Sequence, residues 1–235
     1  MTKHMDKTHR KKSRTIETLN AIEHRYHIFC EGTKTEPLYF KGFKDSIENN
    51  PVYKNVIQIE IIGTGQSTKN IINIARENVK TTKIMHAEIW CLYDKDDFPE
   101  DDFNSVSLTV DDLNSNTETS SDVSYHVAWS NQCFEYWVIL HFKNYKSNTH
   151  RDCYIETLDK EFMRIVGTTY KKNNECLFDH LTTYGNPKLA IKWAKDQILE
   201  CKDLTDAKSA PATKVYLLVE KLAIYLPDNI KSKYI

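Results

Sequence analysis

The sequence predicts an α/β fold: a mostly parallel sheet flanked by helices, followed by a C-terminal helical region. Two observations support this prediction. Across residues 21–145, short apolar and β-branched runs alternate with amphipathic helical patterns, the order that produces parallel strands covered on both faces. Across residues 146–235, only helical patterns follow one another, and we expect them to pack on the α/β core.

The elements of the α/β part are expected in the following order. Strands are predicted at about 26–30, 56–62, 87–93 and 123–129, with helices at about 35–49, from 67 or 68 to 79, at 99–113, and from Ser130 or Asn131 to 142. Thr33 and Glu36 have the spacing of a capping box, and Pro37 suits a first helical turn. Gly63-Thr64-Gly65 predicts a tight turn, since it lacks the further glycine and the lysine of a phosphate-binding loop.

The C-terminal region is expected to contain no strand. Its helices are predicted at about 151–166, 174–184, 187–201 and 211–225. Asn186-Pro187 is a typical start for the third of them, because asparagine caps a helix and proline fits its first turn.

Composition and charge narrow the possible classes of protein. The chain has 235 residues, a net charge of −1, and 28% charged residues, so overall charge does not indicate a nucleic-acid binder. Residues 1–20 form a basic arm that is either a solvated tail or a phosphate-contacting segment. No apolar run approaches the roughly 20 residues of a membrane span, so we expect no membrane partner and a cytoplasmic location.

The cysteines and one buried-stripe histidine are expected to be structural. The chain has 6 cysteines without any Cys-x-x-Cys pair, a spacing that supports neither a zinc site nor a disulfide framework. His141 lies on the apolar stripe of a predicted helix and is expected to be a core residue.

Acidic residues follow two of the expected strands. Glu31 comes directly after the first strand, and Asp94 and Asp96 come after the third. The carboxyl ends of parallel strands form the functional crevice of such sheets, and an extended backbone would place Asp94 and Asp96 on one side. Carboxylates gathered there suit Mg²⁺ or Mn²⁺. The alternatives are a solvated loop glutamate and an acidic turn that caps the next helix.

Further polar residues are candidates for the same site. Glu135 is either a solvated acid or a further catalytic carboxylate, and Asn131 is expected one helical turn before it, on the same helix face. Lys34 and Lys95 are weaker candidates for binding a substrate phosphate. Glu36 and Asp97 are weaker still, because a capping role is available for Glu36.

The ordered motifs resemble a known family. They are Cys30-Glu31-Gly32-Thr33-Lys34-Thr35-Glu36-Pro37, Tyr93-Asp94-Lys95-Asp96-Asp97-Phe98, Ser130-Asn131-Gln132-Cys133-Phe134-Glu135-Tyr136-Trp137 with His141-Phe142, and Pro211-Ala212-Thr213-Lys214-Val215 with Leu218-Val219-Glu220. The strand–Glu-Gly–helix and strand–Asp-x-Asp pattern resembles the Toprim domain, and the whole set resembles the RloB-like (AbiLii) family. Gln132 stands where that family is expected to have proline.

The resemblance implies a Rossmann-like Toprim fold and a Mg²⁺-dependent endonuclease that cleaves RNA such as tRNA, or DNA. Glu31 would be the Toprim glutamate, and Asp94 and Asp96 the Asp-x-Asp pair. The family implies a toxic effector in bacterial antiphage defence with an ATPase partner, and the helical region could also form a homodimer contact. The alternative is a catalytically inactive, nucleic-acid-binding regulatory subunit of an ATPase complex.

Overall fold

The computed structural model describes residues 22–116 and 122–235, and its centre is a 4-stranded sheet of order β2-β1-β3-β4. The strands are β1 (His24–Cys30), β2 (Ile57–Gly63), β3 (Ala87–Leu92) and β4 (Val123–Val127), and each neighbouring pair is parallel. The predicted α/β fold class is therefore confirmed. The predicted basic arm, residues 1–20, lies outside the described residues.

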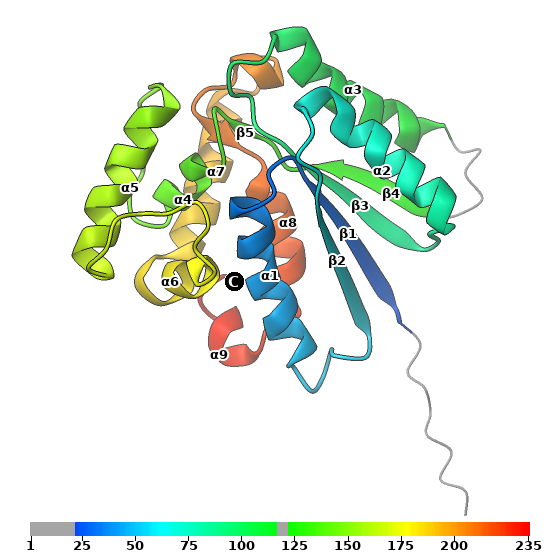
Figure 1. The fold of residues 1–235 in the computed structure, drawn as a ribbon, viewed down its shortest axis with the longest axis horizontal. Helices are drawn as coiled ribbons and strands as arrows, with labels where there is room; N and C mark the ends of the chain where they lie inside the picture. The colour runs from blue at the N-terminus through cyan, green and yellow to red at the C-terminus, as the bar shows by residue number, and fades with distance from the viewer. Residues whose placement is uncertain (1–21, 117–121) are drawn as a thin grey trace, which may run out of the picture.

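Helices cover both faces of this sheet. They are α1 (Thr35–Glu48), α2 (Thr68–Thr82) and α3 (Glu100–Ser115), with α2 and α3 on one face and α1 on the other (Figure 1). The alternation of β1 explains the two layers. Ile28 and Cys30 pack with the α1 side chains, whereas Phe29 packs with residues of α2 and α3.

The prediction of a helix from Ser130 or Asn131 to residue 142 is wrong about where the helix begins. Ser130–Asn131 is a strand, β5, paired antiparallel with β6 (Ala212–Thr213), and helix α4 spans only Glu135–Leu140. Backbone hydrogen bonds to the loop after β3 hold this segment extended, because Lys95 N donates to Ser130 O at 2.9 Å. The expectation of a C-terminal region without strands is wrong for the same reason, since β6 lies within it.

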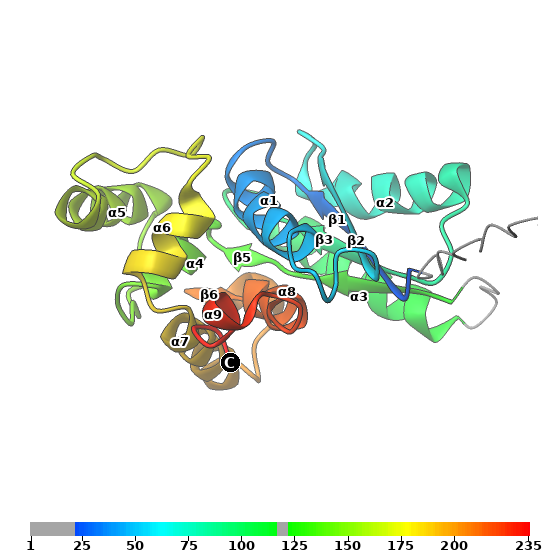
Figure 2. The same ribbon diagram turned by 90° about the horizontal axis from the view of Figure 1, so that it is seen from below.

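The C-terminal helices otherwise match their predicted positions. They are α5 (Arg151–Ile165), α6 (Leu177–Tyr184), α7 (Pro187–Glu200) and α8 (Val215–Ala223), with the additional short helices η1 (Asp206–Lys208) and α9 (Asp228–Lys231). Asn186 caps α7 as predicted, accepting a hydrogen bond from Leu189 N at 3.0 Å. Of these helices, α6 packs against α1 (Figure 2). One continuous set of buried side chains includes residues of β1, α1 and α4 through α8.

His141 and four of the six cysteines, which were expected to be structural, are buried. His141 is buried, and its Nδ1 lies 3.0 Å from Trp137 O. All cysteines are free: Cys30, Cys91, Cys133 and Cys201 are buried, and Cys153 and Cys176 are exposed.

Within the described part of the chain, no helix combines the length and the apolar character that a membrane crossing requires.

Candidate functional site

An acidic cavity of about 260 Å³ opens where β1 and β3 end. The acidic side chains that line it are Glu31, Glu36, Asp94, Asp96 and Glu135. Lys34 and Lys172 also line it. The structure thus brings together all four predicted catalytic carboxylates, and it adds Glu36 and a lysine from the C-terminal region.

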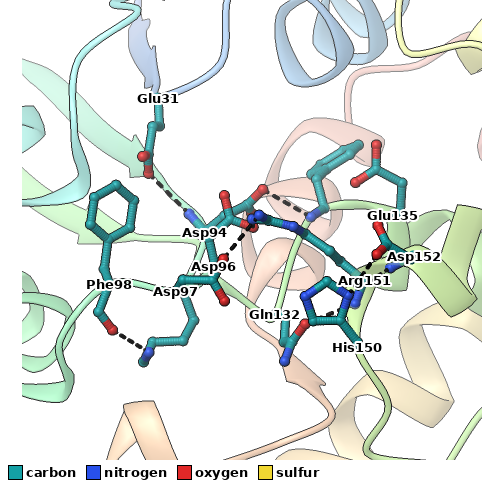
Figure 3. Close-up of polar contacts among 12 residues, drawn as sticks. Glu31, Asp94, Asp96, Asp97, Phe98, Gln132, Glu135, His150, Arg151 and Asp152 are labelled. Carbon is teal, nitrogen blue, oxygen red and sulfur yellow. Dashed lines mark hydrogen bonds and ion pairs between the residues drawn. The ribbon is translucent and has the colours of Figure 1, made fainter.

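Neighbouring strands bring Glu31 and Asp94 together. β1 and β3 pair in parallel up to Cys30 and Leu92, so the residues that follow meet at one edge of the sheet. One carboxylate oxygen of Glu31, Oε2, accepts a hydrogen bond from Asp94 N at 3.2 Å (Figure 3). The same oxygen accepts a hydrogen bond from the Thr68 hydroxyl at 2.8 Å. Thr68 begins α2, so the start of a third element fixes this carboxylate.

The charges of Asp94 and Glu31 are costly in this surrounding. Burial, followed by the nearby Glu36, Glu135 and Asp96 charges, raises the pKa of Asp94 well above its ordinary value. Burial also raises the pKa of Glu31. Only the Phe134 backbone N–H, 3.1 Å from Asp94 Oδ2, acts in the opposite direction among the main influences on Asp94. The cavity therefore concentrates negative charge at the edge of the sheet.

Asp96 lines the cavity, but its carboxylate is engaged elsewhere. The Asp96 backbone has φ 39°, so the chain after β3 is not extended and the predicted alternation with Asp94 does not hold. Asp96 Oδ1 lies 2.7 Å from Nη1 of Arg151, whose Nη2 lies 3.0 Å from Asp97 Oδ2. Figure 3 shows the Arg151 side chain reaching from the start of α5 to this loop.

Glu135 is part of the cavity wall. It is 1% exposed, and its Oε1 accepts a hydrogen bond from the Tyr170 hydroxyl and pairs with Lys172 Nζ, each at 3.2 Å. The reading of Glu135 as a solvated acid is therefore wrong. Glu36 lies nearby and is 6% exposed, and burial raises its pKa to about 7, with the Glu135 charge acting in the same direction.

Two predicted substrate-binding residues lie outside the cavity lining. Asn131 is buried in β5, and its amide donates to Ala207 O at 2.8 Å, so it does not share a helix face with Glu135. Its role is to join β5 to the chain before β6. The Lys95 ammonium donates to Phe98 O within its own loop. Lys34, by contrast, lines the cavity.

The residues that sequence reasoning missed come from other parts of the chain. Thr68, Arg151, Tyr170 and Lys172 contact the acidic residues but follow no acidic motif. The position of Thr68 at a helix start after β2 was a usable signal, because that turn lies at the same sheet edge. No local pattern identifies the other three, since they reach the cavity only through the packing of α5 and α6.

A match to a known family covers both walls of this cavity. The family model described as RloB-like protein matches residues 26–222. The chain belongs to the RloB-like family. The match includes Glu31 and Asp94 on the sheet side and Arg151 and Lys172 on the helical side. Comparison of this RloB-like chain with curated proteins and with solved structures finds no match.

The stability of this RloB-like protein should fall as pH rises toward neutrality. The pKa of Glu36 is higher in the folded chain, about 7, than its ordinary 4.5, so its contribution to stability is complete below pH 4.5 and is lost as pH rises through 7. Urea unfolding in EDTA should show that the free energy of unfolding falls by up to ~3 kcal/mol between about pH 5 and 8 because of Glu36. The pKa values of Asp94 and Glu31 are also raised, so these residues add to the fall.

The variant Glu36→Gln isolates the contribution of Glu36 to the pH dependence of stability. Glu36→Gln stays neutral at every pH, so its free energy of unfolding should depend less on pH than that of the native chain. Glu48→Gln, an exposed change on the same helix, should leave the native pH dependence intact. Parallel curves for Glu36→Gln and the native protein would contradict the buried position of the Glu36 charge.

Proposed function

We propose that this protein is a Toprim-type, Mg²⁺- or Mn²⁺-dependent endonuclease that hydrolyses phosphodiester bonds in RNA or DNA. It would act as a cytoplasmic toxic effector of antiphage defence together with an ATPase partner. The observation that carries the proposal is the meeting of Glu31 and Asp94 at one edge of a parallel sheet, in a cavity lined also by Asp96 and Glu135.

The donor set fits a hard divalent cation. Glu31, Asp94 and Asp96 would hold it through carboxylate oxygens, which are the ligands that Mg²⁺ and Mn²⁺ prefer. Burial raises the pKa of Asp94 most, and the nearby Glu36, Glu135 and Asp96 charges raise it further; a bound cation would offset both effects. When bound, a divalent ion supplies Lewis-acid polarisation of a phosphate and activation of water.

Hydrogen-bond donors of the chain itself orient the carboxylates of Glu31 and Asp94. The Thr68 hydroxyl and Asp94 N direct one oxygen of Glu31, and Phe134 N directs one oxygen of Asp94, so both carboxylates have fixed orientations and an oxygen left over. These donors come from α2, the loop after β3 and the start of α4. Preorganised groups of this kind contribute to catalysis because they need no rearrangement when the substrate arrives.

Arg151 competes with a cation for the Asp96 carboxylate, because its Nη1 lies 2.7 Å from Asp96 Oδ1. Arg151→Gln should therefore bind Mn²⁺ about 1.4- to fivefold more tightly in isothermal titration calorimetry, since a partly exposed ion pair contributes roughly 0.2–1 kcal/mol. Arg164→Gln removes the same charge further along α5, where Arg164 pairs with Glu161, and should leave the affinity unchanged. Equal Mn²⁺ affinities of Arg151→Gln and the native protein would contradict the competition between Arg151 and the cation for Asp96.

One observation favours the inactive regulatory subunit as a second candidate. Across residues 22–116 and 122–235, no group of three His, Cys, Asp or Glu side chains stands ready to hold a metal ion. In a regulatory subunit, the Asp96–Arg151 pair would be a permanent structural contact that joins the β3 loop to α5.

A cleavage assay separates the two candidates. The protein would be titrated with Mg²⁺ or Mn²⁺ against labelled tRNA, single-stranded DNA and duplex DNA, alone and with the ATPase of a neighbouring gene. Cleavage that appears with the ion and disappears in EDTA supports the nuclease. Binding of these substrates without cleavage under any of these conditions supports the regulatory subunit.

A further inference from the structure

A lysine from the connection between α5 and α6 reaches the acidic cavity. Lys172 Nζ lies 3.2 Å from Glu135 Oε1, and the Lys172 side chain is 59% exposed whereas that of Glu135 is 2% exposed. The same ammonium group therefore faces a buried carboxylate on one side and solvent on the other. A lysine placed only to neutralise Glu135 would not need this access to water.

The backbone around Lys172 is attached to the cavity wall. Lys172 O accepts a hydrogen bond from the Thr35 hydroxyl at 3.0 Å, in the first turn of α1. Two residues earlier, Tyr170 N donates to Asp159 Oδ1 at 2.9 Å, and the Tyr170 hydroxyl donates to Glu135. These hydrogen bonds tie the backbone at Tyr170 and Lys172 to α1 and α5. The backbone position of Lys172 is therefore fixed.

The Tyr170 hydroxyl allows Lys172 to exchange Glu135 for another anion. Both Tyr170 and Lys172 contact Oε1 of Glu135. If the Lys172 ammonium moved to an incoming anion, Glu135 would keep the Tyr170 hydrogen bond, and a buried carboxylate would not be left without a donor. The Glu135 charge raises the pKa of Lys172 against the lowering effect of burial, so the ammonium stays charged at neutral pH.

A polyanionic substrate needs cations at this acidic cavity. Lys34 and Lys172 are the lysines that line it in the described chain, whereas Lys95 donates to Phe98 O and Arg151 is paired with Asp96 and Asp97. Lys34 stands where α1 begins and is exposed. Of the two lining lysines, Lys172 is the one whose ammonium group already pairs with a buried carboxylate of the cavity, Glu135.

We propose that Lys172 is a substrate-positioning residue that binds a phosphate group of the nucleic acid at this cavity, exchanging Glu135 for the phosphate. The inference rests on the proposed nuclease function and adds to it a contact from the C-terminal helical region. Tyr170 keeps Glu135 satisfied during the exchange, and the fixed backbone sets where along the strand the phosphate is held.

Nucleic-acid binding measured without cleavage tests this role. Fluorescence anisotropy in EDTA, with a labelled single-stranded RNA and a DNA of the same sequence, would be recorded at several salt concentrations. Lys172→Met should weaken binding several-fold at low salt and reduce the slope of log affinity against log salt by about one phosphate contact, whereas Lys172→Arg should keep the native slope. Lys171→Met removes an exposed neighbouring charge and should leave the slope unchanged.

Kinetics supply the second readout. In the cleavage assay, Lys172→Met should raise KM roughly tenfold with a smaller change in kcat, because a phosphate contact that is equally strong in the bound substrate and in the transition state contributes mainly to binding. A folded Lys172→Met protein with native salt slope and native KM would overturn the proposal, as would a native chain that binds neither nucleic acid. Binding that depends on Lys172 in a native chain that never cleaves would uphold the phosphate contact and reject the nuclease.

Discussion

Asp94→Asn should abolish phosphodiester cleavage, lowering kcat/KM by at least ~10³-fold, while the protein stays folded. The substitution keeps the shape of the side chain and an oxygen that can accept the Phe134 N–H, so the local structure should survive. It removes the charge that the proposed cation requires, and a bound cation contributes several kcal/mol to such reactions, at about 1.4 kcal/mol per tenfold in rate.

The stability of the same variant provides an internal check. Burial and the neighbouring Glu36, Glu135 and Asp96 charges raise the pKa of Asp94, so its negative charge is a cost in the folded chain without a cation. Asp94→Asn should therefore unfold in EDTA at the same urea concentration as the native protein or at a higher one, the usual opposition of stability and activity at an active site.

Asp111→Asn is the matched control, because Asp111 is exposed on α3 and away from the cavity lining. It should retain native kcat/KM. Native cleavage by Asp94→Asn would show that the acidic cavity is not the catalytic site. Loss of activity together with loss of folding would instead assign Asp94 a structural role.

The sheet-side half of the site was predictable from sequence, and the reason is topological. Glu31 and Asp94 each follow an apolar strand, and neighbouring parallel strands must end at the same edge. The other half was not predictable by such rules. Arg151 and Lys172 reach the acids because α5 and α6 pack against α1 and α4, and periodicity indicates that a helix exists but not where it packs.

The error at Asn131 has the same origin. The local sequence pattern predicted that a helix begins at Ser130 or Asn131, since both residues are favoured at helix N-caps. Their backbones instead pair with Ala212 and Thr213, far along the chain, and with the loop after β3. Hydrogen bonds between residues so distant in sequence leave no periodic signal, and they place the side chain of Asn131 toward Ala207 rather than toward Glu135.

Gly42→Ala should destabilise the protein by about 2 kcal/mol, although a rule based on sequence gives the opposite sign. Gly42 lies in the middle of α1, where alanine normally stabilises by roughly 0.5–1 kcal/mol. A Cβ at this position would lie 2.2 Å from Cβ and 2.3 Å from Cγ of Phe178, which is 2% exposed in α6. Overpacking of a core typically costs about 1–3 kcal/mol and here must exceed the gain in helix propensity.

Urea unfolding of a graded series tests this packing. Gly42→Val should cost more than Gly42→Ala, because its additional methyl groups meet the same buried ring. Gly167→Ala is the comparison variant: Gly167 has φ 78° and no atom within 4 Å of an added Cβ, so its cost, of order 1 kcal/mol, comes from the backbone alone. α1 carries Glu36 and packs on α6 at Phe178. An unchanged or raised stability of Gly42→Ala would therefore mean that the helical region does not pack on α1 as described. The placement of Lys172 at the cavity would then be wrong as well.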